Sequence, residues 1–303
     1  MDVRSATLLG PLLGMWLAVL PSGATWAAPQ LKQVSVSNVQ FTYAEAGSGD
    51  PIVFVHGELQ DYRAWSKQVD VFSENYRAIA YSRRNHFPNQ VAADGTGDSA
   101  AEAHGVDLAA FVSVLGLKNV HVVALGSGAH AALFFAAKYP EMVRTLVVHE
   151  PPAVGLLRNS PLGLTMYRTL ETQMNPARDA FRAGEMLQGV RIFHDAVHGA
   201  GNYDGLDEEL QKMMLENAPA QAADAVDKNP PKLFTCEMAR EITAPTLVTS
   251  GKNSPPMFER IIDELMQCMP NSNDQIVISG AHDAPIDNPR AFNKAVLAFI
   301  KKR

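Results

Sequence analysis

The sequence is poor in cysteine and has no excess of basic residues. Only Cys236 and Cys268 occur in 303 residues, which excludes a disulfide-dense scaffold. From the sequence alone, these two thiols either pair in an oxidising compartment or remain isolated. The formal net charge is −6, and Lys and Arg are spread along the chain. Because nucleic-acid binders need a concentrated basic surface, we expect no nucleic-acid partner.

Long apolar runs are also missing, except near the N-terminus. Residues 1–28 contain an early arginine, the run LLGPLLGMWLAVL and then several small residues, which is the layout of a secretory signal. Pro11 and Pro21 bound a run that is too short for a comfortable membrane span. We therefore expect cleavage after Ala24 or Ala27, a periplasmic or secreted protein, and no stable membrane span after cleavage.

Internal repeats and low-complexity segments are absent, and strand-like and helix-like segments alternate instead. The apolar stretches PIVFVHG, NVHVVAL and VRTLVVHE are typical of buried parallel strands, and helical spacing follows the first two. This alternation predicts an α/β fold with a mostly parallel sheet that binds its ligand at the carboxyl ends of the strands. Before it, VSVSNVQFTYAEAG predicts a hairpin with its turn at Ser37 and Asn38.

The strand signal is missing from residues 153–235, where amphipathic segments rich in methionine take over. This predicts a helical lid inserted between two parts of one core, residues 29–152 and 236–303. Within the lid, ARDAFRAGEMLQGVRIFHDAV is interpreted as one helix. The methionines favour an adaptable lining for apolar ligands, with packing between lid helices as the alternative.

The order of these pieces resembles the α/β-hydrolase superfamily over nearly all of the chain after the signal. The resemblance rests on His56-Gly57 after a strand, on LGSGAHAALFFAAKYPE, on APTLVTSGKNSPP and on SGAHDAPIDNP. It implies the α/β-hydrolase fold with a helical lid. It also implies a site made of a nucleophile, a histidine base and an acid, which hydrolyses small-molecule esters without a cofactor.

In this superfamily the nucleophile stands on a tight turn between strand and helix, with small residues two places on either side. With Ser127 at the tip, the bulky Leu125 would fill one of these small slots. With Gly126 at the tip, the slots hold Ala124 and Gly128. We therefore predict that Gly126 occupies the nucleophile position, and that Ser127 is the alternative nucleophile if the turn is remodelled.

The resemblance also assigns the base and the acid. His282, in SGAHDAPIDNP, matches the general base. Ser254 stands where the acid is usual, so the acid falls to Glu150, at the end of VRTLVVHE. Asp283 and Asp263 are the alternatives that we rank below Glu150.

The oxyanion hole is assigned to the backbone N–H groups of Glu58 and Ser127, which survive the loss of a nucleophilic side chain. We predict an exported hydrolase-family protein that takes a small apolar or carbonyl-containing substrate. Two alternatives stay open: a non-catalytic ligand-binding pseudoenzyme, and a nucleophile-free lyase or isomerase that uses His282 as its base. The neighbouring Arg83 and Arg84 are interpreted as loop anchors or solvated charges, with contact to an anionic substrate as a further alternative.

Two further patterns compete with this interpretation. GSGAHA (residues 126–131) matches GxGxxA between a strand and a helix, with Glu150 at the end of the next strand, so a dinucleotide-binding oxidoreductase is a third alternative. His194 and His198 have the spacing of two metal ligands on a helix, but the Glu of HExxH is absent and no third ligand is evident. We interpret them as a solvated helix face, and we predict neither a metal nor a cofactor.

Overall fold

An eight-stranded sheet forms the centre of the fold in the computed structural model, which describes residues 29–36, 39–89, 100–226, 232–269 and 274–303. The signal segment and the hairpin turn expected at Ser37 and Asn38 lie outside the described residues. The strands are β1 (Gln30–Val36), β2 (Val39–Ala46), β3 (Pro51–Val55), β4 (Arg77–Tyr81), β5 (Val120–Leu125), β6 (Val143–His149), β7 (Thr246–Gly251) and β8 (Asp274–Ile278).

The strand order is β1-β2-β4-β3-β5-β6-β7-β8. The pairs β1–β2 and β2–β4 are antiparallel, and all the other neighbouring pairs are parallel. The predicted α/β fold with a mostly parallel sheet is therefore confirmed. Because parallel strands end at the same edge, the loops after β3, β5, β6 and β8 meet there.

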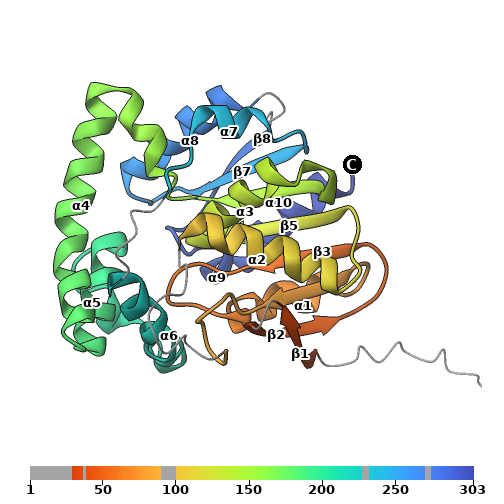
Figure 1. Ribbon diagram of the computed structural model, residues 1–303, viewed down its shortest axis with the longest axis horizontal. Helices are drawn as coiled ribbons and strands as arrows, with labels where there is room; N and C mark the ends of the chain where they lie inside the picture. The colour runs from red at the N-terminus through yellow and green to blue at the C-terminus, as the bar shows by residue number, and fades with distance from the viewer. Residues whose placement is uncertain (1–28, 37–38, 90–99, 227–231, 270–273) are drawn as a thin grey trace, which may run out of the picture.

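Helices cover both faces of the sheet (Figure 1). The helices of this core are η1 (Tyr62–Trp65), α1 (Ser66–Phe72), α2 (Ala101–Val114), α3 (Gly126–Lys138), η2 (Pro140–Met142), α7 (Cys236–Arg240), α8 (Pro256–Cys268), α9 (Ala284–Asp287) and α10 (Pro289–Ile300). The side chain of Asp61 caps η1 by accepting a hydrogen bond from the Arg63 backbone N–H.

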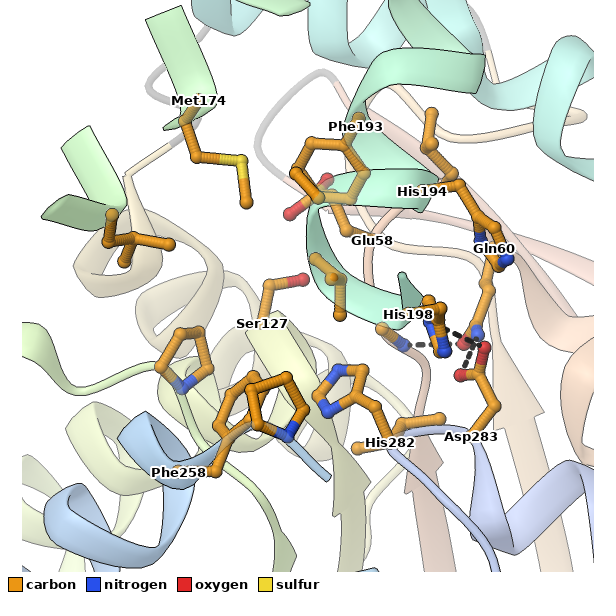
Figure 2. Close-up of a pocket in the computed structure, with 18 of the residues that line it drawn as sticks. Glu58, Gln60, Ser127, Met174, Phe193, His194, His198, Phe258, His282 and Asp283 are labelled. Carbon is orange, nitrogen blue, oxygen red and sulfur yellow. Dashed lines mark hydrogen bonds and ion pairs between the residues drawn. The ribbon is translucent and has the colours of Figure 1, made fainter. Parts of the chain in front are cut away.

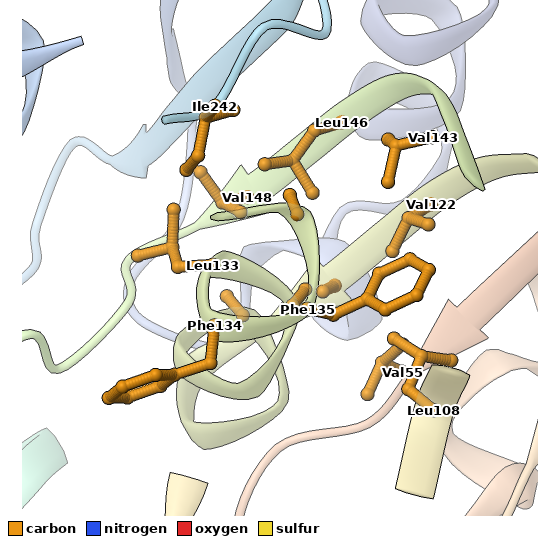
Figure 3. Packing of buried hydrophobic residues seen from close by; sticks show 14 of the residues in the cluster. Val55, Leu108, Val122, Leu133, Phe134, Phe135, Val143, Leu146, Val148 and Ile242 are labelled. Atoms are coloured by element: carbon orange, nitrogen blue, oxygen red, sulfur yellow. The ribbon is translucent and has the colours of Figure 1, made fainter. Parts of the chain in front are cut away.

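Side chains that alternate along the strands build the two halves of the core. On one face, Val53 and Val55 of β3 pack in the cluster formed with α2, α3 and α8, part of which is drawn in Figure 3. On the other face, Ile52 and Phe54 pack in the cluster formed with α1 and α10. Since both faces of β3, β5 and β6 are covered, the apolar stretches predicted to form buried parallel strands do lie in the core.

Between β6 and β7 the described residues contain helices and no strand. These elements are η3 (Val154–Asn159), α4 (Pro161–Arg182), α5 (Met186–His198), η4 (Tyr203–Gly205) and α6 (Glu208–Val226), followed by α7. We call α4, α5 and α6 the cap helices, and they gather at one side of the molecule (Figure 1). None of the described helices is both long and apolar enough to cross a membrane.

The expectation of a single helix over ARDAFRAGEMLQGVRIFHDAV was wrong. The chain leaves α4 at Arg182 and begins α5 at Met186. Gly184 lies between them with φ +78°, a conformation that glycine adopts without steric cost and that lets the chain turn back. As a result α5 packs against α4 instead of extending it.

The two cysteines form a disulfide. Cys236 begins α7 and Cys268 ends α8, so the bond joins two helices beside the same face of the sheet. Of the two alternatives that the sequence left open, the structure has the paired one.

Candidate active site

A cavity of about 260 Å³ lies between the cap helices and the carboxyl edge of the sheet. Figure 2 shows the side chains around it. The core contributes Glu58, Ser127 and His282, and the cap helices contribute Met174 and Phe193, among other residues. Apolar side chains make up most of the lining. Its polar groups come from the end of β3, the start of α3, the loop after β8 and the cap helices α4 and α5.

Gly126 is the tip of the turn that joins β5 to α3. Its φ is +54°, whereas Ser127 has no positive φ. Gly128 lies so close to β3 that a Cβ added to it would stand 2.1 Å from the carbonyl oxygen of His56. The small residue expected two places after the tip is thus required by the approach of α3 to the end of β3, and the turn has Gly126 where the nucleophile was expected.

His282 and Glu150 lie together beside this turn. Nδ1 of His282 is 2.7 Å from Oε2 of Glu150, whose other carboxylate oxygen accepts a hydrogen bond from the Gly251 backbone N–H at 2.7 Å. Glu150 is fully buried and has φ +45°, which is unusual for a residue with a Cβ and is typical of functional sites. The ring of Phe258 stacks on the imidazole of His282, with 4.5 Å between the ring centroids.

The charge of Glu150 fixes the tautomer of His282. Burial raises the pKa of this carboxyl, but the hydrogen bond to His282, together with the electrostatic interactions with the His149 and His282 rings, outweighs burial, so the net shift is downward. An ionised carboxylate can only accept, so Nδ1 of His282 donates and Nε2 keeps the lone pair. Nε2 faces the turn, because a Cβ added to Gly126 would stand 3.1 Å from it.

Ser127 lines the cavity, but its hydroxyl interacts with Arg83 and Glu58 and not with His282. Its Oγ accepts a hydrogen bond from Nη2 of Arg83 at 2.9 Å and also interacts with the Glu58 carboxylate. Within the described part of the chain, no hydrogen bond joins Ser127 to His282. The alternative nucleophile therefore does not contact the base in this arrangement.

Arg83 connects the two segments that carry the predicted oxyanion donors. Its side chain is 2% exposed, and Nη2 donates to the carbonyl oxygen of Gly57, at 2.9 Å, and to Oγ of Ser127. The backbone N–H of Arg83 donates to Nε2 of His56, so His56 has a structural role. Arg83 is thus a buried anchor, and its neighbour Arg84 is anchored by an ion pair with Asp107.

Glu58 places an ionised carboxylate at the cavity wall. Burial raises its pKa, but a hydrogen bond from His86 and the charge of Arg83 hold the pKa well below its usual range. Its Oε1 is 3.5 Å from Nε2 of His86 and 3.7 Å from Nη2 of Arg83. The sequence indicated only the backbone of Glu58, since nothing in HGELQ points to a carboxylate held by a distant Arg and His.

The interpretation of His194 and His198 as a solvated helix face was wrong. His194 is 3% exposed, and its ring stacks on that of His198 with 4.2 Å between centroids. Nε2 of His198 is 3.2 Å from Oδ2 of Asp283, and both histidines line the cavity. The sequence does not indicate this cluster, because Asp283 lies in a loop 85 positions after His198. Asp283 contacts His198 and Gln60, while Glu150 is the carboxylate that contacts His282.

Residues 52–295 match the alpha/beta hydrolase family. The chain belongs to this family. Among the curated relatives, a 2-hydroxy-6-oxononadienedioate/2-hydroxy-6-oxononatrienedioate hydrolase of Burkholderia vietnamiensis is 26% identical, and the match covers 86% of this chain and 90% of the relative. A 2-hydroxy-6-oxo-6-phenylhexa-2,4-dienoate hydrolase of Comamonas testosteroni is 22% identical over 94% of this chain and 99% of the relative.

Solved structures of hydrolases have the same fold. A serine hydrolase involved in carbazole degradation aligns with a TM-score of 0.70 at 19% identity, covering 91% of this chain and 100% of the other. A thermophilic esterase from Thermogutta terrifontis aligns with a TM-score of 0.65 at 22% identity, covering 90% and 98%. At these identities the likeness concerns the fold alone.

Proposed function

We propose that this protein is a hydrolase-family enzyme without a nucleophilic side chain, in which His282 acts as a general base on a water molecule. The observation that carries the proposal is that His282 is oriented as a base, while the residue in front of it is a glycine. Glu150 holds the imidazole through Nδ1, so that Nε2 faces Gly126, which has no side chain. A water molecule beside Gly126 would take the place of a serine hydroxyl.

The proposed step needs only groups that line the cavity. Nε2 of His282 takes a proton from the water, and the water oxygen adds to the carbonyl carbon of the substrate. The carbonyl oxygen becomes an anion, which the backbone N–H groups of Glu58 and Ser127 would bind. When the tetrahedral intermediate collapses, the leaving group departs with the proton from His282, so no acyl-enzyme forms.

The substrate that fits this account is a small apolar molecule with a carbonyl group. Met174 and Phe193 of the cap helices supply apolar contact at the cavity wall. The names of both hydrolase relatives describe oxo-acid substrates, which supports a carbonyl compound for this chain as well. The dinucleotide-binding alternative is disfavoured because Glu150, the acid that would bind a ribose, is fully buried and bonded to His282 and Gly251.

We also propose that the protein is exported. The segment 1–28 has the layout of a secretory signal, and the Cys236–Cys268 disulfide fits an oxidising compartment. N-terminal sequencing of the protein recovered from the periplasm or medium should find a start at Thr25 or Ala28. Full-length protein found only in the cytoplasm would contradict export.

Pre-steady-state kinetics with a series of p-nitrophenyl esters tests the proposed step. We expect turnover without an initial burst of p-nitrophenol, because the ester is hydrolysed in one addition and no acyl-enzyme accumulates. His282→Gln should slow turnover by roughly 10²–10⁴-fold, the usual contribution of a general base. Asp263→Asn, on the exposed side of α8, is the matched control and should leave turnover unchanged.

Two results would contradict the proposal. A burst equal to the enzyme concentration would show that a side chain attacks the ester. No turnover above background with any ester or oxo-acid, together with saturable binding of the same compounds, would make the protein a ligand-binding pseudoenzyme.

A further inference from the structure

Three side chains with metal-ligating atoms meet at one end of the cavity. His194 and His198 stand one turn apart on α5, and Asp283 comes from the loop beside His282. One potential ligand atom of each lies within 4.8 Å of the others. We propose that His194, His198 and Asp283 bind one divalent transition-metal ion of the Zn²⁺ class.

The distance between two of the ligands fits the coordination sphere of such an ion. Nε2 of His198 and Oδ2 of Asp283 are 3.2 Å apart. Ligands at 2.0–2.1 Å in a tetrahedral arrangement around Zn²⁺ are separated by about 3.3 Å, so these two atoms already have the required spacing. Without an ion the same two groups bond to each other.

Hydrogen bonds from neighbouring side chains orient His194 and Asp283. Nε2 of His194 is 2.9 Å from Oδ1 of Asn202, so a proton on Nε2 would leave the lone pair of Nδ1 for an ion. Gln60 donates from Nε2 to Oδ1 of Asp283 at 3.1 Å, which leaves Oδ2 for the same purpose. Ligating histidines and carboxylates are usually held by hydrogen bonds of this kind, which fix the ring and the carboxylate in place.

The ligand atoms indicate which ion would bind, and their place in the cavity indicates that the ion would contact the substrate. Two imidazole nitrogens and one carboxylate oxygen suit Zn²⁺ and its neighbours better than Mg²⁺ or Ca²⁺, which prefer oxygen ligands. Three protein ligands leave a coordination position for a water molecule or a carbonyl oxygen. All three ligands line the cavity that contains His282, with 5.7 Å between the ring centroids of His198 and His282, so the ion would reach the same substrate.

Metal titration of the protein without a polyhistidine tag tests this site. Visible absorption of added Co²⁺, competed by Zn²⁺, reports the number of sites, the affinity and the tetrahedral geometry. We expect one equivalent to bind. His198→Ala and Asp283→Asn, which lie on different elements, should each weaken binding at least tenfold. His130→Gln, a histidine of α3 outside the cluster, is the control and should bind as the wild type does.

Metal binding is measured separately from ester turnover. The metal site can therefore be disproved without disproving the proposed function, and the reverse also holds. Circular dichroism melting curves identify any variant that does not fold, and His198→Gln then replaces His198→Ala. Absence of Co²⁺ and Zn²⁺ binding at about 100 µM free metal, far above a micromolar Kd, would overturn the proposal. So would binding that neither His198→Ala nor Asp283→Asn weakens.

Discussion

The chemistry proposed for this molecule depends on the few atoms that surround Nε2 of His282. Glu150 holds the ring from the Nδ1 side, Phe258 stacks on one of its faces, and Gly126 leaves the Nε2 side without a side chain. A glycine at φ +54° avoids the steric cost of roughly 1–3 kcal/mol that a Cβ would meet there. The glycine therefore stabilises the turn, and it places no side chain beside Nε2 of His282.

Replacing Glu150 by glutamine tests the orienting role of the carboxylate. Gln keeps the size of the side chain but removes the charge, and its amide can donate to Nδ1, which would put the proton on Nε2. We expect kcat to fall by about 10³–10⁴-fold with little change in KM, as when the acid of a triad is replaced by its amide. Asp263→Asn, on the exposed side of α8, replaces an alternative acid and should leave kcat unchanged. A larger loss in Asp263→Asn than in Glu150→Gln would contradict the assignment of the acid.

At the scale of elements, the sequence predicted what local patterns determine. The apolar stretches of β3, β5 and β6 predicted a parallel sheet, and the small residues around Gly126 predicted the turn before α3. The sequence did not predict which distant segments contact each other. The break at Gly184 was missed because the apolar spacing of α4 and α5 continues across it, and the joining of His198 to Asp283 depends on how the cap helices pack on the core.

The disulfide between α7 and α8 should stabilise the fold without affecting the site. Cys236 and Cys268 are 32 positions apart, and closing a loop of that length in the unfolded chain is worth about 3–4 kcal/mol in the chain-entropy account. We expect the Cys236→Ser, Cys268→Ser double variant to unfold at a lower denaturant midpoint. Its kcat should equal that of the wild type, because neither cysteine lines the cavity. An unchanged midpoint would contradict this prediction.

Over the whole molecule, buried neutral histidines should make stability depend on pH. Burial lowers the pKa of His149 to about 4, and burial together with the charge of Arg83 lowers the pKa of His104 well below its usual value. In the unfolded chain both titrate near pH 6.5, so the unfolded state takes up protons first as the pH falls. Their contribution to stability is complete above pH 6.5 and is lost progressively toward pH 4.

Urea unfolding between pH 7.5 and pH 4.5 measures this loss. We expect the free energy of unfolding to fall across the interval, and His104→Phe to fall less steeply, since it removes one group that titrates only when unfolded. Each unit of difference in pKa between the folded and unfolded states is worth about 1.4 kcal/mol. Equal slopes for the wild type and His104→Phe would contradict the prediction.

The absence of a nucleophile is tested most directly by labelling with a fluorophosphonate, read by intact-protein and peptide mass spectrometry. The account predicts no covalent adduct on the wild type and an adduct at position 126 of the Gly126→Ser variant, where the new hydroxyl would lie between Nε2 of His282 and the predicted oxyanion donors. The Cβ added by this substitution would stand 3.1 Å from Nε2, so the imidazole must shift slightly, and some loss of stability is expected. An adduct on Ser127 of the wild type that disappears in Ser127→Ala would contradict the account, because Ser127 would then be the nucleophile.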